Sequence, residues 1–173
     1  LVAALLRLAR YPFLIIPVIS DVPFSEAAHS KREPTLRPFE TEHRILQAAT
    51  PEGRKLDMHE LEWVKAKWIS TSHLMQRSRQ FNLAVRACDA CTVQGRTSAS
   101  MLAVWGGLEQ LFAVSAGEIR FRVSSYLASY LEPPGQQRFE LFKKIMEVYN
   151  TRSKAAHTAG EIDSSAFVQS YVL

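Results

Sequence analysis

Two residues suited to phosphate chemistry stand near the end of an amphipathic stretch, in the sequence YNTRSKAAHTAG at residues 149–160. Arg152 takes the place of a hydrophobe in an apolar stripe whose other members are Leu141, Ile145, Val148 and Ala155. Arginine matches phosphate oxygens with its planar fork and keeps its charge. His157 follows five residues later, and histidine exchanges a proton near neutral pH. The pair therefore has the chemistry needed to bind a phosphodiester and to move a proton during its cleavage.

An acidic residue interrupts a second apolar stripe in the same way. Within residues 98–114, Glu109 stands at helical spacing among Leu102, Trp105 and Phe112. Because Glu109 and Arg152 carry opposite charges at semi-buried positions, we expect them to pair across two helices. Two interpretations of this pair are open: a structural ion pair, or an arginine held in a fixed orientation for a phosphate.

The elements that must position these residues are predicted from hydrophobic periodicity and helix breakers. A helix begins after Asp57, whose spacing to Glu60 fits a capping box. Further helices are expected over 72–92, 98–114, 117–131 and 137–158, and another begins after residue 160. Such helices, joined by short breaks, bury their apolar stripes against each other. The prediction is a mainly α protein built as an antiparallel helical bundle.

Individual stripes give expectations for the core. Over 117–131 the stripe consists of Ile119, Val123, Tyr126 and Tyr130; over 137–158 the first stripe consists of Phe139, Phe142, Met146, Tyr149, Ser153 and Ala156. Gly106 and Gly107 inside a helix indicate a close helix crossing, with the seam of a dimer as one option. The basic pairs Arg120 with Arg122 and Lys143 with Lys144 are expected on solvated faces. They would form a path for RNA if they converge near Arg152.

Residues 1–55 are less regular and are predicted to be an N-terminal extension or the end of an upstream domain, before a bundle over 56–173 whose last helix is cut off. Residues 1–10 favour a short helix and residues 13–24 a strand or edge segment. The charged, proline-containing residues 25–43 indicate a linker or surface loop, and residues 40–49 a short helix. A start without Met and an end inside an apolar pattern indicate a piece of a longer polypeptide.

Composition sets limits on the class of protein. Of 173 residues, 47% are hydrophobic, which is enough for a globular core. With 21 Lys and Arg against 17 Asp and Glu, the formal charge of +4 tolerates a polyanionic partner without establishing one. Two cysteines, Cys88 and Cys91, do not make a disulfide framework, and without a second pair they are expected as packing residues rather than zinc ligands. Arginines and prolines break the apolar N-terminus, so no membrane span is predicted. We expect a cytoplasmic protein without a metal or cofactor.

The stretch YNTRSKAAHTAG resembles the signature of HEPN domains, in which an Arg and then a His, usually separated by four to six residues, close a helix of a four-helix bundle. Together with LEQLF at 108–112, GEIRFRVSSYLASYLE at 117–132 and RFELFKKIMEV at 138–148, it is more specifically similar to the ApeA-like HEPN group. The resemblance covers residues 57–173 and is clearest over 101–160. It implies a metal-independent endoribonuclease in toxin–antitoxin or antiphage defence systems. The partners that it implies are RNA, a second copy of the chain, and an antitoxin or regulatory domain.

The resemblance also implies roles for individual residues. Arg152 would bind the scissile phosphate, and His157 would transfer a proton to or from the reacting oxygens, with Glu109, Tyr149 and Ser153 in support. Ser153 departs from the Asn, Asp or His that many members carry after the Arg, but it stands four residues before His157 on the same helix face, and a hydrogen bond between the two is expected. Ala159 stands where some toxins have a tyrosine that an antitoxin modifies, so that mode of neutralisation is not expected. Some HEPN domains only dimerise or bind nucleotides or RNA, and a catalytically inactive bundle is therefore the alternative.

Overall fold

The computed structural model of the chain describes residues 1–9, 14–27, 29, 31–40, 56–94, 96–112, 117–157 and 164–172. Within these ranges the chain is mainly helical, as predicted, and its strands form one two-stranded sheet. The elements are α1 (Val2–Ala9), β1 (Val18–Ser20), α2 (Phe24–Ala27), β2 (Leu36–Pro38), α3 (Met58–Arg77), α4 (Arg79–Ala90), the short 3₁₀ helix η2 (Cys91–Val93), α5 (Thr97–Phe112), α6 (Ile119–Leu131), α7 (Gln136–His157) and α8 (Ser164–Val172).

Local capping explains where α3 begins and ends. The Asp57 carboxylate accepts a hydrogen bond from the Glu60 amide at 2.9 Å, and the Glu60 carboxylate accepts one from the Asp57 amide at 3.0 Å, so the predicted capping box is confirmed. The predicted start of the next helix at residue 72 was wrong. Ser78 has an extended backbone, and its hydroxyl accepts a hydrogen bond from the Phe81 amide at 3.2 Å, which makes it the N-cap of α4.

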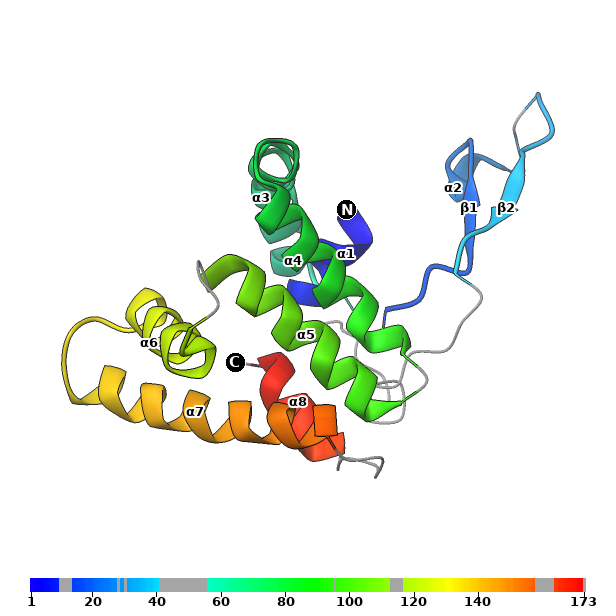
Figure 1. Ribbon diagram of the computed structural model, residues 1–173. Coiled ribbons are helices and arrows are strands. Elements are labelled where there is room, and N and C mark those ends of the chain that lie inside the picture. The colour runs from blue at the N-terminus through cyan, green and yellow to red at the C-terminus, as the bar shows by residue number, and fades with distance from the viewer. Residues whose placement is uncertain are drawn as a thin grey trace.

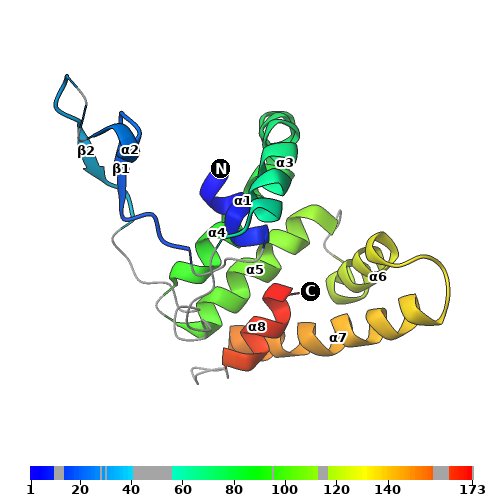
Figure 2. The same ribbon diagram turned by 180° about the vertical axis from the view of Figure 1, so that it is seen from behind.

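Helix α5 lies at the centre of the helical body, where it packs against α4, α6, α7 and α8 (Figure 1). Helices α6 and α7 form an antiparallel hairpin along one side, and α8 crosses the C-terminal half of α7 (Figures 1 and 2). Glu109 belongs to the last turn of α5, while Tyr149 and Arg152 belong to the C-terminal part of α7. This packing brings residues about forty positions apart in the sequence onto facing helices.

The main core surrounds Trp105, which is fully buried and donates a hydrogen bond from Nε1 to the Ser170 hydroxyl at 3.1 Å. The other buried members of this core include Met101, Val123, Leu127, Ile145, Val148 and Phe167. The predicted close crossing is confirmed at Gly107, between α4 and α5. A Cβ added there would lie 3.1 Å from the Ala87 Cβ and 3.2 Å from the Ala84 carbonyl oxygen, whereas one added at Gly106 would meet nothing within 4 Å.

Two expected core stripes were wrong in part. On α7 the buried stripe is the one that contains Ile145, Val148 and Ala155, because this face meets α5. Phe139, from the stripe expected inside, is 51% exposed, and Ser153 and Ala156 are also exposed. On α6, Tyr126 and Tyr130 are exposed and only Val123 of their stripe is fully buried. Helices α6 and α7 lie at the edge of the helical bundle. Each therefore buries the apolar stripe that faces the neighbouring helices and leaves its other stripe exposed to solvent.

The N-terminal residues contain more structure than predicted. Strands β1 and β2 pair antiparallel, with Ile19 opposite Arg37, and this small sheet projects away from the helices (Figure 1). The strand expected within 13–24 is confirmed as β1, but α2 and β2 lie in the segment expected to be a linker. The helix expected over 40–49 lies, beyond Glu40, outside the described residues.

Helix α1 packs against α3 through a second apolar cluster of Leu5, Leu6 and Val64. Arg7 on α1 is 1% exposed, and its guanidinium is held by the Glu40 carboxylate, by Asp89 Oδ1 at 2.5 Å and by the Leu14 carbonyl oxygen at 3.0 Å. These bonds anchor the N-terminal residues to α4, because a buried guanidinium requires partners for its donors.

Candidate functional site

The predicted pair between Glu109 and Arg152 is present across α5 and α7. Arg152 Nη2 lies 3.1 Å from Glu109 Oε1 and 3.3 Å from Glu109 Oε2. The Tyr149 hydroxyl donates a hydrogen bond of 2.7 Å to Glu109 Oε1. The Arg152 guanidinium also lies over the Tyr149 ring, with Cζ 5.5 Å from the ring centroid. One carboxylate therefore orients both a tyrosine and an arginine, and the three groups form a compact cluster at the edge of the core.

Buried core residues hold this cluster in place. The rings of Trp105 and Tyr149 make an edge-to-face contact with centroids 5.0 Å apart, and Trp105 is itself locked by its hydrogen bond to Ser170. A tyrosine between a buried indole and a carboxylate has little rotational freedom. The position of Arg152, which touches both Glu109 and Tyr149, is therefore fixed by the α5–α7 packing.

Arg152 is the most open member of the cluster. The exposed fraction of its side chain is 26%, against 16% for Glu109. Its Nε atom is buried, and no hydrogen-bond acceptor for it exists among the described residues. A buried donor without an acceptor is costly, because it has lost water without gaining a replacement. The Arg152 guanidinium therefore has one nitrogen, Nη2, bonded to Glu109, and one buried donor, Nε, that has no acceptor among the described residues.

The surroundings raise the pKa of Tyr149 from its ordinary value of 10 to about 12. Burial is the main cause, since it disfavours the phenolate, and the hydrogen bond to Glu109 and the charge of Glu109 act in the same direction. The positive charges of Arg152 and Arg120 oppose them. Tyr149 is therefore a neutral hydrogen-bond donor to Glu109 throughout the physiological range.

Arg120 adds a second cation beside the cluster. It lies in the first turn of α6, and its Nη1 donates a hydrogen bond of 2.8 Å to the Asn150 side chain, on the residue after Tyr149. The sequence placed Arg120 on a solvated face, which is correct for its exposure, but could not show that Arg120 lies close to Asn150 and Tyr149. The only signal was its place at the start of a helix following the one that holds Glu109.

The structure therefore brings together three of the five predicted site residues: Glu109, Tyr149 and Arg152. Ser153 is exposed on the next position of α7. His157 is the last residue of α7, but its side chain lies outside the described part of the structure. The expected hydrogen bond between Ser153 and His157 lies outside it for the same reason.

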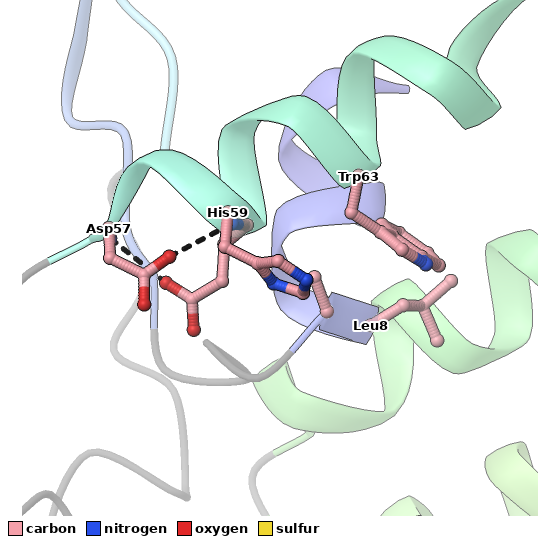
Figure 3. A pocket seen from close by; sticks show the side chains of 6 residues that line it. Leu8, Asp57, His59 and Trp63 are labelled. Carbon is pink, nitrogen blue, oxygen red and sulfur yellow. Dashed lines mark hydrogen bonds between the residues drawn. The ribbon is translucent and has the colours of Figure 1, made fainter.

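A separate hollow of about 370 Å³ lies where α3 begins, beside the end of α1 (Figure 3). His59, Trp63 and Leu8 border it, and Asp57 and Glu60 supply its carboxylates. Both carboxylates already accept backbone hydrogen bonds in the capping box. The Asp57 and Glu60 amides are thereby engaged, and the two carboxylates beside the hollow disfavour an anion there.

No group of three or more His, Cys, Asp or Glu side chains within the described ranges is arranged to hold a metal ion. Cys91 is buried and donates to the Cys88 carbonyl oxygen at 3.0 Å, while Cys88 is half-buried. Among the described helices, none combines the length and apolar content that a membrane span requires. Comparison of the chain with protein-family models, with curated proteins and with solved structures finds no match.

Proposed function

We propose that this chain is a HEPN-type, metal-independent endoribonuclease in which Arg152 binds the scissile phosphate and His157 transfers a proton. The observation that supports the proposal most directly is the state of the Arg152 guanidinium. It is fixed on one side by Glu109 and Tyr149, it is partly open to solvent, and its buried Nε has no acceptor among the described residues. A phosphate oxygen is a suitable acceptor for such a group.

The chemistry needs few protein groups because RNA carries its own nucleophile. The ribose 2′-oxygen attacks the adjacent phosphorus, the bond from phosphorus to the 5′-oxygen breaks, and a 2′,3′-cyclic phosphate forms. A base takes the proton of the 2′-OH, an acid gives one to the 5′-oxygen, and a cation stabilises the charge on the phosphoryl oxygens. Arg152 is assigned the last role and His157 one of the proton transfers.

The place of His157 at the end of α7 suits this role. Five residues along a helix correspond to a rise of about 7–8 Å and a rotation of about 140°, so the two side chains do not share one face and the proposal requires the long Arg152 side chain to reach toward the same phosphate. The C-terminal end of a helix also favours the protonated imidazole. In this proposal two copies of the chain form a cytoplasmic homodimer that contributes two Arg–His pairs to one cleft. Its cellular setting would be antiphage defence or a toxin–antitoxin pair.

A specific observation favours the alternative, a catalytically inactive bundle for dimerisation or for binding nucleotides or RNA. The Glu109 carboxylate neutralises Arg152 at about 3 Å and competes with any incoming phosphate. In an inactive bundle, this pair would serve packing specificity between α5 and α7 rather than catalysis.

Cleavage of single-stranded RNA by the wild type, Arg152→Ala, His157→Ala and the double variant tests the proposal. His157→Ala should lower the rate by about 10²–10⁴-fold, and Arg152→Ala by about 10²–10³-fold. The double variant should lose far less than the product of the two, because both groups act on one phosphate. Chelation should have no effect, and the equivalent DNA, which lacks the 2′-OH, should survive.

Matched controls are available on α3, which packs on α1 and α4 rather than on α7. Arg77→Ala and His73→Ala remove the same side-chain types from exposed positions and should leave cleavage unchanged. Undiminished cleavage by His157→Ala would contradict the mechanism. No cleavage by a folded, dimeric wild type would favour the inactive bundle.

A further inference from the structure

The hairpin of α6 and α7 exposes aromatic side chains that have no partner in the core. Phe121 is 53% exposed and Phe139 is 51% exposed. They lie on facing helices near Phe142, whose ring makes an edge-to-face contact with Phe121 at a centroid distance of 5.6 Å. Large apolar rings at half exposure are costly in water, so a cluster of them indicates a surface that receives a ligand.

The three rings line a groove of about 250 Å³ between the two helices. Hydroxyl and guanidinium groups lie among them, and the groove is lined by Phe121, Ser125, Ser129, Arg138, Phe139 and Phe142. Lys143 places its Nζ 4.2 Å from the centroid of the Phe139 ring. The groove therefore has an apolar interior that can receive a flat ring, and it has polar groups that can form hydrogen bonds with the edge of that ring.

Charge is concentrated on the same hairpin. Residues Ile119–His157 contain seven Lys and Arg and three Asp and Glu, an excess of +4 that equals the formal charge of the whole chain. Including Glu118, which directly precedes α6, leaves an excess of +3. The other parts of the chain are thus close to neutral. A cationic surface with exposed aromatic rings is complementary to a ligand that carries both negative charge and flat rings.

The groove and the Arg152 cluster follow one another along α7: the groove is lined by the first part of this helix, and Tyr149 and Arg152 belong to its C-terminal part. Phe121, at one end of the groove, is preceded by Arg120, which bonds to Asn150 on the C-terminal part of α7. Arg120 also lies close enough to Tyr149 for its charge to act on that phenol. Along the axis of α7, the aromatic groove is therefore followed by Arg120 at Asn150 and then by Arg152.

We propose that the aromatic groove of Phe121, Phe139 and Phe142 holds an unstacked base of single-stranded nucleic acid, whose backbone continues past Arg120 to Arg152. The direction of the strand rests on the proposed function, because only that function assigns the scissile phosphate to Arg152. Binding of the base does not rest on it. A duplex keeps its bases stacked and paired, so the groove should select single strands.

Binding of a labelled single-stranded oligodeoxythymidine, followed by fluorescence anisotropy, tests this inference without any cleavage, since DNA lacks the 2′-OH. Phe139→Ala and Phe121→Ala should each weaken binding by about 5- to 150-fold, the range for loss of one stacked base. Phe139→Leu should weaken it to a similar extent, because leucine keeps an apolar contact but offers no ring. The control Phe24→Ala removes another exposed phenylalanine, on α2, and should change nothing.

The salt dependence gives a second measurement. For single strands, loss of one phosphate contact reduces the slope of log K against log salt by about 0.7. Lys143→Ala should show this reduction, and Lys65→Ala, on the exposed side of α3, should not.

Several results would overturn the inference. These are full affinity in Phe139→Ala and Phe121→Ala, equal affinity of Phe139→Leu and the wild type, or equal binding of duplex and single strand. A change in oligomeric state without a change in oligonucleotide binding would assign the groove to a second copy of the chain. Ring-dependent binding of the oligonucleotide in a protein that cleaves no RNA would support the groove and refute the nuclease proposal, so the two failures are distinguishable.

Discussion

Tyr149 should make the protein lose stability at alkaline pH to an extent that can be calculated. Its pKa is about 12 in the folded protein, against about 10 in an unfolded chain. Each pKa unit corresponds to about 1.4 kcal/mol, so the two units correspond to about 2–3 kcal/mol. The Tyr149 ring is buried, but its hydroxyl lies beside Arg152, whose side chain is 26% exposed, so solvent screens the interaction and the realised loss should be smaller, about 1–2 kcal/mol.

The direction follows from which form the fold prefers. Since the folded state holds the phenolic proton more tightly, the full contribution is present below about pH 10 and is lost as the pH rises from about 10 to about 12. Urea unfolding between about pH 9 and pH 12 measures the loss. Other groups also titrate there, so the informative quantity is the difference between the wild type and Tyr149→Phe.

Tyr149→Phe should be less stable than the wild type at neutral pH, because the hydrogen bond to Glu109 is gone, but it should lack the additional alkaline loss of about 1–2 kcal/mol. The ring stays against Trp105, so the core is preserved. Parallel loss of stability in both proteins over this range would refute the reasoning. It would mean that Tyr149 is neither as buried nor as closely tied to Glu109 as the structure indicates.

Three further substitutions address the Arg152 cluster and the α4–α5 crossing. Glu109→Gln should lower the free energy of unfolding by about 1–3 kcal/mol, less than for a fully buried pair because both side chains keep some exposure. It should also tighten binding of inorganic phosphate to Arg152, measured by calorimetry; unchanged phosphate binding would favour a structural pair. Gly107→Ala should cost about 1–3 kcal/mol in urea unfolding, because its Cβ would press on Ala87 and on the α4 backbone. Gly106→Ala, which meets nothing within 4 Å, should instead gain up to about 1 kcal/mol from helix propensity, and equal effects at both positions would contradict the packing described.

Helix positions were predictable because their causes are local. The Asp57 and Glu60 capping box and the break after residue 131 depend on neighbours a few residues away, and the periodicity of α5, α6 and α7 fixed their limits to within two residues. One local cause was nevertheless missed, because the apolar periodicity continues past it. Ser78 was expected inside a helix, but its hydroxyl accepts a hydrogen bond from the Phe81 amide, so it caps a new helix and lets the chain turn from α3 into α4.

The sequence by itself determined that Glu109 and Arg152 interrupt apolar stripes, because helical periodicity alone shows a charge in the place of a hydrophobe. It also determined the mainly helical fold and the close crossing near Gly107. Only the tertiary structure decided which of two apolar stripes on α7 is buried. That choice depends on which face meets α5, and periodicity is the same for both stripes. The same choice leaves Phe139 at the surface and brings Arg120, thirty residues away from Asn150, beside the Arg152 cluster.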